Sequence, residues 1–213
     1  MPNLLNKPIY RMTHLDNLEG ILESGKVCAP NHPQTDPNYK SIGLNDLIKK
    51  RSQKPVPLGN GGTFLDYVAF YFGARSPMLL KIKDGNEVPQ VPQSEIIYLA
   101  SDTNTIHDHH CSFVFFDGHA SKAISKPFTD LADLNQLDWI AVNARYWQDD
   151  PNSDMNFDRQ RKKQAEFLVA NEVPLSCILK ILTFEEASCE KVRMLLAEKG
   201  LNIPVEVDKT LYY

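Results

Sequence analysis

A glutamate at the edge of an apolar run is the side chain best suited to chemistry. Glu166 follows the basic stretch 161–163 and precedes Phe167-Leu168-Val169. Burial beside such a run destabilises a charged carboxylate unless a cation or a bound polar ligand compensates. The same sequence is also compatible with an exposed glutamate on an amphipathic helix, because helix and strand are hard to tell apart over 161–169. The segment alone leaves both interpretations open.

Lysine and arginine gather in two short stretches, although the net charge of the chain is −4. Each stretch taken alone is typical of a solvated helix face. The acidic balance argues against a protein that coats nucleic acid through bulk charge, but not against an enzyme that grips a few nucleotides in a local groove. The first stretch holds Lys49, Lys50, Arg51 and Lys54, and the second holds Arg159, Arg161, Lys162 and Lys163.

Histidines supply the other titratable candidates. His107, His109 and His110 form a close trio in a polar segment, which predicts a surface loop rather than a metal site with converging ligands. His119, in the stretch Phe-Asp-Gly-His-Ala, is the better candidate for a functional imidazole. We therefore expect no metal.

The motifs of several common nucleotide-binding and hydrolytic sites are missing. No GxGxxG follows a predicted strand, since Gly59-Asn60-Gly61-Gly62 precedes a strand and opens no helix. Neither GxxxxGK[ST] nor GxSxG occurs. A Rossmann site, a P-loop and a nucleophile elbow are thus unsupported.

The elements that must position these residues mix strands and helices without regular alternation, which favours an α+β fold. Asp16 is the expected N-cap of the first helix, and Gly25 is expected to end it. Neither a repeat nor a low-complexity linker interrupts the 213 residues, so we expect one domain over 1–213. Strands are predicted at 9–14, 67–72, 78–82, 96–100, 112–116, 178–184 and 204–207, helices at 15–22, 45–51, 131–137, 139–145 and 188–199, and a loop at 29–39.

Composition indicates an ordinary globular protein, with 42% hydrophobic and 23% charged residues. The four cysteines lie far apart without a CxxC pair, as expected of reduced thiols. No run approaches the roughly 18 apolar residues of a membrane span. We expect a cytoplasmic protein without a membrane partner.

Five separated motifs resemble those of one family. The motifs are Tyr10-Arg11-Met12-Thr13-His14, Gly61–Phe72 with Arg75–Leu79, Phe113-Val114-Phe115 with Asp117-Gly118-His119, Gln164–Leu168, and Tyr212-Tyr213. In order and at similar spacing over essentially the whole chain, they look like those of the DarT toxins, the DNA ADP-ribosyltransferases of bacterial toxin–antitoxin pairs. The early motif of that family often has histidine where this chain has Arg11.

The resemblance implies a fold and a reaction. The implied fold is that of an ADP-ribosyltransferase, with a split central β-sheet flanked by helices. The implied reaction moves ADP-ribose from NAD+ to a base of single-stranded DNA, with thymidine favoured, and releases nicotinamide. Positive charge develops on the ribose as the nicotinamide bond breaks, as in glycoside cleavage.

The resemblance also implies the roles of individual residues. Glu166 is expected to be the catalytic carboxylate that stabilises the cationic ribose. Arg51 is expected to contact the target base and stabilise its anion, because an arginine stays protonated. The residues expected to hold NAD+ are Arg11, Thr13, His14 and Tyr71.

A DNA-facing segment is implied between Lys126 and Gln164. Arg145-Tyr146-Trp147 places aromatic rings beside a cation, the combination that holds splayed single-stranded bases. His119 is expected to assist at this DNA-facing side.

Other assignments remain open at this point. Guanosine is the alternative target base, and protein or RNA is the alternative acceptor. A catalytically inactive single-strand-binding module is the rival without enzymatic activity. The resemblance further implies a cognate antitoxin with an ADP-ribosylglycohydrolase macrodomain, and we expect the chain itself to be a monomer.

Overall fold

A large, mostly antiparallel sheet organises the molecule. The computed structural model describes residues 6–149 and 158–213. Within these ranges eight strands form one sheet in which only β10 runs parallel to its neighbour β9. A second, two-stranded sheet pairs β2 (Lys26–Cys28) with β8 (Glu172–Pro174). In spatial order the large sheet comprises β10 (Val205–Val207), β9 (Lys180–Thr183), β4 (Ile96–Asp102), β1 (Pro8–His14), β3 (Tyr67–Tyr71), β7 (Glu166–Ala170), β5 (Phe113–Phe116) and β6 (Pro127–Phe128).

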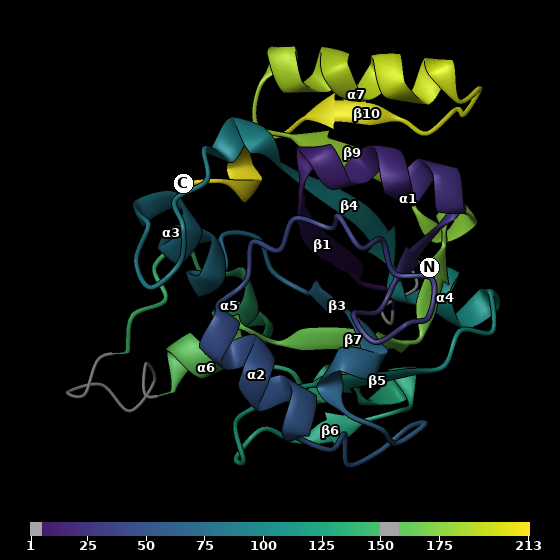
Figure 1. Ribbon diagram of the computed structural model, residues 1–213. Coiled ribbons are helices and arrows are strands. Elements are labelled where there is room, and N and C mark those ends of the chain that lie inside the picture. Colours follow the sequence, from purple (N-terminus) through teal and green to yellow (C-terminus); the bar gives the residue numbers. More distant parts are fainter. Residues whose placement is uncertain (1–5, 150–157) are drawn as a thin grey trace.

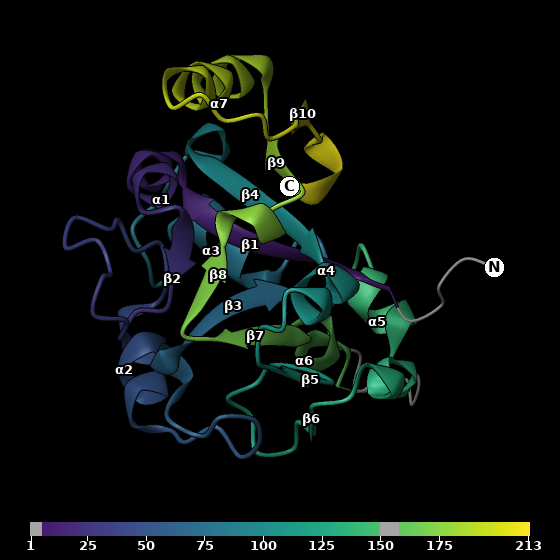
Figure 2. The ribbon, with the colours of Figure 1, turned by 90° about the vertical axis from the view of Figure 1, so that its right-hand side faces the viewer.

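Helices flank this sheet, and the predicted α+β class is confirmed. Figure 1 shows α1 and α7 near the β9–β10 end of the sheet, and Figure 2 shows α2 on one side of the sheet and α4 and α5 on the other. None of the helices in the described ranges is long and apolar enough to cross a membrane. The helices are α1 (Leu18–Ser24), α2 (Asn45–Gln53), α3 (Pro77–Asp84), α4 (Thr103–Asp108), α5 (Trp139–Asn143), α6 (Arg159–Lys163) and α7 (Glu186–Glu198).

Alternation along the strands divides the core between the two faces of the sheet. In β4, Ile97 and Leu99 join the cluster that packs against α1 and α7, whereas Ile96 and Tyr98 join the cluster that packs against α3. Side chains of successive strand residues point to opposite faces, so one strand serves both clusters. The same rule sets Glu166 on the face opposite to Phe167 in β7.

The sheet is split between β1 and β3. Tyr10 and Tyr71 are the register partners that join these strands, and the following residues of β1 pair only with β4. The Arg11 guanidinium bridges the opening, since Nη1 donates a hydrogen bond to the Ala69 carbonyl at 3.1 Å. β3 is fully paired on its other side, where Tyr71 lies opposite Glu166. The predicted split therefore occurs beside the candidate catalytic carboxylate.

One predicted strand is a helix. Residues 78–82 belong to α3, whose beginning and end have clear local causes. Ser76 caps the helix by accepting a hydrogen bond from the Leu79 N–H, Pro77 occupies the first turn, and Gly85 ends the helix at φ 68°. The prediction was wrong because a short apolar run does not distinguish a buried strand from a buried helix.

The start of the first helix also differs from the prediction. Leu15–Asn17 forms a 3₁₀ turn, and the His14 side chain, not Asp16, caps it by accepting from the Asp16 N–H. Gly25 ends α1 in the left-handed region at φ 69°, as predicted. All four cysteines are free; Cys177 and Cys189 are buried, whereas Cys28 and Cys111 are half-buried.

Candidate active site

Glu166 begins β7 and is 2% exposed, so the exposed-helix alternative is wrong. Its Oε2 accepts a hydrogen bond from Arg51 Nη1 at 2.8 Å, and its Oε1 accepts one from the Ala120 N–H at 2.9 Å. These charge-assisted bonds compensate for removing the carboxylate from water. The sequence predicted that a buried Glu166 requires a compensating cation, and Arg51 provides it.

Arg51 comes from the last turn of α2, far from Glu166 in sequence. Its side chain is 12% exposed, and its guanidinium carbon lies 5.0 Å from the centre of the Phe64 ring. Stacking on that ring and the ion pair together fix the direction of a long side chain. Lys54, just after the helix, donates from Nζ to the Ser121 carbonyl at 2.5 Å. The first basic stretch therefore contacts both Glu166 and the segment beside it.

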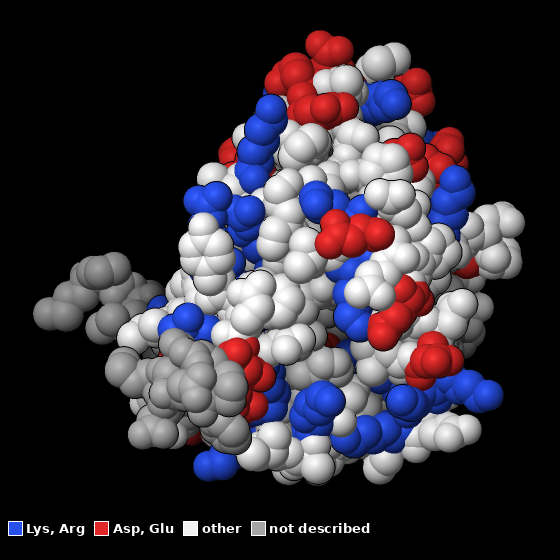
Figure 3. Space-filling model, turned by 90° about the vertical axis from the view of Figure 1, so that its left-hand side faces the viewer, with Lys and Arg blue, Asp and Glu red and all other residues white. Residues whose placement is uncertain are grey.

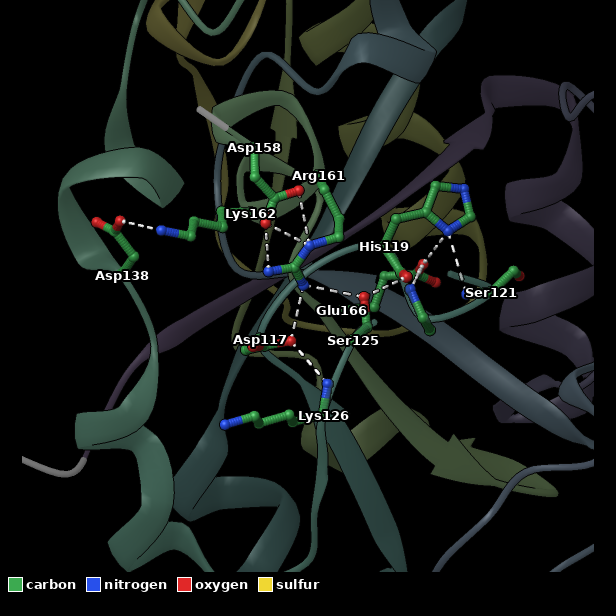
Figure 4. A network of polar contacts seen from close by, with 11 residues as sticks. Asp117, His119, Ser121, Ser125, Lys126, Asp138, Asp158, Arg161, Lys162 and Glu166 are labelled. Atoms are coloured by element: carbon green, nitrogen blue, oxygen red, sulfur yellow. Dashed lines mark hydrogen bonds and ion pairs between the residues drawn. The ribbon is translucent and has the colours of Figure 1, made fainter. Parts of the chain in front are cut away.

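His119 lies next to Glu166 (Figure 4), in the segment between β5 and β6. Its Nδ1 is 3.6 Å from Glu166 Oε1 and accepts a hydrogen bond from the Ser121 N–H at 3.2 Å. Desolvation lowers the pKa of His119 below its ordinary value, although the nearby carboxylate opposes the shift. The ring is thus neutral at pH 7, and because Nδ1 is an acceptor its proton resides on Nε2.

A cleft of about 190 Å³ opens at the split in the sheet. Arg11, Tyr71 and Arg51 line it, together with Tyr39 from the loop 29–39. The Tyr39 hydroxyl accepts a hydrogen bond from Arg11 Nη2 at 3.2 Å. Burial, and secondarily the charge of Glu166, raises the pKa of Tyr71 far above its ordinary value, so this phenol stays protonated.

Two residues predicted to hold NAD+ do not line this cleft, and their role stays a prediction. Thr13 is fully buried, and its hydroxyl is bonded to Tyr39 and to the Asn17 amide. The His14 ring caps the 3₁₀ turn and lies 3.3 Å from Glu95. Neither is among the side chains that line the cleft in the described ranges. Thr13 thus orients Tyr39, a cleft residue that the prediction of a plain loop at 29–39 overlooked.

A larger cavity of about 570 Å³ adjoins the cleft. The two share Leu44, Leu47 and Met78, and His119 lines the larger one. The cleft alone is smaller than the roughly 300–1,000 Å³ of a typical ligand site, whereas the joined space falls within that range. Figure 3 shows lysines and arginines along the lower part of this face, with acidic side chains above them. Cations that line the larger cavity are Lys50, Lys81 and Lys122.

The predicted DNA-facing triplet is divided by burial. Tyr146 is 73% exposed, and Arg145 lies 6.0 Å from its ring centre. Trp147 is 8% exposed, and its indole N–H donates to the Tyr213 hydroxyl at 2.7 Å. Trp147 thus packs against Tyr213 at its indole nitrogen, and its predicted contact with DNA stays a prediction. Residues 150–157 of the predicted DNA-facing segment lie outside the described residues.

No metal site emerges from the parts of the chain that the structure describes, since no three His, Cys, Asp or Glu side chains converge there. His107, His109 and His110 are exposed, as predicted, but His107 lies in the last turn of α4 and only His109 and His110 follow it outside the helix.

The comparison with known families decides between the possible functions. A model described as "ssDNA thymidine ADP-ribosyltransferase, DarT" matches residues 10–213. The chain belongs to the DarT family. The resemblance of the five sequence motifs is therefore confirmed, and with it the class of enzyme, an NAD+-dependent DNA ADP-ribosyltransferase.

Individual DarT relatives cover almost the whole chain. A DNA ADP-ribosyl transferase of Thermus sp. (strain 2.9) is 39% identical over 90% of this chain and 88% of its own length. The structure of Thermus sp. 2.9 DarT in complex with ADP-ribosylated ssDNA has a TM-score of 0.90 at 37% identity, covering 97% of this chain and 96% of that one. The same protein in complex with NAD+ has a TM-score of 0.84 at 36% identity, covering 97% and 98%.

A more distant DarT relative has a second activity in its name. It is a DNA ADP-ribosyl transferase–DNA ADP-ribosyl glycohydrolase fusion protein of Thermosipho africanus, 23% identical over 97% of this chain and 50% of its own length.

Proposed function

We propose that this chain transfers ADP-ribose from NAD+ to the thymine base of single-stranded DNA and releases nicotinamide. The observation that carries the proposal is a buried carboxylate, Glu166, whose contact residues line two adjoining cavities. Its ion-pair partner Arg51 lines the first cavity, and its neighbour His119 lines the second. A carboxylate whose immediate partners line both a dinucleotide cleft and an acceptor cavity suits transfer between two substrates. The sequence and structure of the Thermus enzyme support the same reaction.

The cleft is the proposed NAD+ site. Arg11 is suited to the pyrophosphate through charge-assisted hydrogen bonds, and Tyr71 offers a flat face to the nicotinamide. Glu166 would hold the hydroxyl of the nicotinamide ribose and stabilise positive charge at its anomeric carbon. The bond to nicotinamide breaks with its electron pair leaving on nicotinamide, which is released neutral.

The larger cavity is the proposed acceptor site. A ring nitrogen of the base gives its proton to solvent, Arg51 at the adjoining cleft stabilises the resulting anion, and this nitrogen then bonds to the anomeric carbon as nicotinamide leaves. His119, protonated on Nε2, is suited to donate a hydrogen bond to a carbonyl of the base. Unpaired DNA suits this site because a nitrogen used in base pairing is hidden in a duplex. Arg145 and Tyr146 are proposed to hold the neighbouring nucleotides.

The proposal extends to partners and location. An enzyme that modifies DNA poisons its host, so we propose a cognate antitoxin with glycohydrolase activity, in keeping with the fused relative. We propose that the chain acts as a monomer in the cytoplasm, where its DNA substrate lies.

The decisive experiment is mass spectrometry of single-stranded oligonucleotides after incubation with NAD+. Thymine-containing strands should gain one ADP-ribose, and thymine-free strands should not. Glu166→Gln should lower the transfer rate by about 10³-fold, since it removes the charge that stabilises the cation but keeps the shape. The matched control is Glu206→Gln at an exposed ion pair on β10, which should react at the wild-type rate.

Each other result selects a different function. Modification of a thymine-free strand that contains guanine would move the target to guanosine. Transfer only to added protein or RNA would exclude DNA as the acceptor. Strand binding that is independent of NAD+, without modification of any acceptor, would identify an inactive binding module.

A further inference from the structure

Arg161, in α6, makes a dense set of polar contacts (Figure 4). Its Nε donates to both carboxylate oxygens of Asp158, at 2.9 and 2.7 Å. Its Nη1 donates to Asp117 Oδ1 at 2.8 Å and to Ser125 Oγ at 3.0 Å. The side chain is 10% exposed, so these bonds are shielded from water and are stronger than those of a surface ion pair. Such a site differs from the solvated helix face that the second basic stretch predicts.

The partners of Arg161 include both ends of the segment 117–125. Asp117 begins this segment and Ser125 ends it, and the Arg161 carbonyl accepts a hydrogen bond from the His119 N–H at 2.9 Å. A Cβ at Gly118 would lie 2.3 Å from Arg161 Nη1 and 2.9 Å from its carbonyl oxygen. Glycine is therefore required for the segment to wrap this closely around the arginine.

The same segment supplies the neighbours of the catalytic carboxylate. Ala120 donates its N–H to Glu166 Oε1, and His119 places its ring beside that oxygen. The Ser125 hydroxyl, which contacts Arg161, also donates to the His119 carbonyl at 2.8 Å. Arg161 is thus connected to Glu166 through the backbone of 117–125 without touching it.

We propose that Arg161 is a positioning residue that fixes the segment 117–125 against the site, so that Ala120 holds Glu166 and His119 faces the acceptor cavity. The proposal rests on the proposed function, because it takes Glu166 as the catalytic carboxylate. A guanidinium fits this role better than an ammonium, since its fork bonds Asp158, Asp117 and Ser125 at once. Misplacing a catalytic group by about 1 Å costs on the order of 10²-fold in rate.

The first test is steady-state transfer to a thymine-containing oligonucleotide by Arg161→Gln. We expect kcat to fall by about 10²-fold, while KM for NAD+ changes by less than about threefold because the cleft residues are untouched. Arg161→Lys should recover part of the loss, since an ammonium can still pair with one carboxylate. The matched control is Lys162→Gln, on the same helix as Arg161, which removes the ion pair between Lys162 and Asp138. It should keep the wild-type kcat.

A double-mutant cycle separates positioning from a general loss of stability. If Arg161 acts through Asp117, the variant that combines Arg161→Gln with Asp117→Asn should be no slower than Arg161→Gln alone. The proposal would be overturned if the rate losses of the two single variants multiplied in the double variant. A higher KM for NAD+ together with a lower unfolding temperature would overturn it as well. A wild-type kcat in Arg161→Gln would overturn it too, whereas an unaffected rate in Glu166→Gln would instead overturn the proposed function.

A milder variant decides the matter if Arg161→Gln does not fold. Ser125→Ala removes one bond to Arg161 and one to the His119 carbonyl, and leaves both carboxylates in place. We expect about a three- to tenfold lower kcat at an unchanged KM, as for the loss of about 1 kcal/mol of hydrogen bonding that holds the reactive geometry. An unchanged kcat would count against the proposal.

Discussion

The two basic stretches resemble each other in sequence and differ in structure. In 49–54, Lys49 and Lys50 are exposed and Arg51 turns inward to pair with Glu166. In 159–163, Arg161 is largely buried among carboxylates. Lys163 of that stretch is 2% exposed, and its Nζ donates to the Val142 carbonyl at 2.8 Å.

Long-range partners cause this difference. Glu166 lies 115 positions from Arg51, and Asp117 lies 44 positions from Arg161. Lys163 bonds a carbonyl, so its buried charge has no carboxylate to neutralise it in the described residues. Cations of two similar runs thus pair with a buried glutamate, bond both ends of a backbone segment, or remain buried without an opposite charge in the described residues. Three substitutions, at Arg51, Lys163 and Lys50, test whether the cations of these two stretches have different roles.

The largest effect is expected for Arg51→Met. A methionine can pack on the Phe64 ring, but it leaves Glu166 without its ion-pair partner and the base anion without a cation. We expect the transfer rate to fall by about 10²- to 10³-fold, as for the loss of one donor that stabilises developing charge. The measurement is the rate of oligonucleotide modification, with Lys49→Met as the control on the same helix. Similar rates for the two variants would show that Arg51 is only one of several surface cations.

An intermediate effect on stability is expected for Lys163→Met. Burial, helped by the nearby charge of Arg75, lowers the pKa of Lys163 to about 8. The unfolded chain holds this proton up to about pH 10.4, so between pH 8 and that value the unfolded state binds more protons than the folded state. The contribution of Lys163 to the free energy of unfolding therefore rises with pH in this window, by up to about 3 kcal/mol.

Guanidinium denaturation of both proteins from pH 7 to 10 measures this contribution. The difference in unfolding free energy, wild type minus Lys163→Met, should be flat below pH 8 and rise above it. Other groups titrate in both proteins alike and cancel in the difference. A difference that stays flat up to pH 10 would show that the lysine is not desolvated as its burial indicates.

Elements with strong local signals were predictable from the sequence. The aromatic and β-branched residues of β3 and the basic end of α2 gave correct elements, because their periodicity and composition agree with their final environment. The prediction for 78–82 was wrong because its apolar residues fit both the helix and the strand period; only the caps at Ser76 and Gly85 indicate a helix. Local sequence signals therefore predict whether a segment is a helix or a strand only where its apolar residues fit one of the two periods and not the other.

The site divides in the same way. Glu166 was recognisable from its motif, but its burial depends on Arg51 and Ala120, which no local pattern connects to it. Tyr39 was missed because its loop has no periodicity, and only its hydroxyl contacts show that it orients Arg11. Pairing across such distances is a property of the assembled sheet and could not be derived from spacing.

The smallest effect is expected for two adjacent exposed lysines of α2. Lys50 lines the larger cavity, whereas Lys49 is exposed one position earlier and is not among the lining residues. If Lys50 contacts one phosphate of the strand, Lys50→Gln should raise KM for the oligonucleotide by a few fold at low salt. It should also reduce the slope of log KM against log salt by about 0.7, the value for one released counterion on a single strand.

Lys49→Gln has the same charge change on the same helix and should alter neither KM nor the salt slope. Because net charge affects both variants alike, only the position of the lysine relative to the cavity can separate them. Equal effects would mean that the strand responds to the whole basic stretch as a diffuse field. The first stretch would then hold one inward arginine within an otherwise uniform solvated face, and the larger cavity would lose its support as the path of the strand.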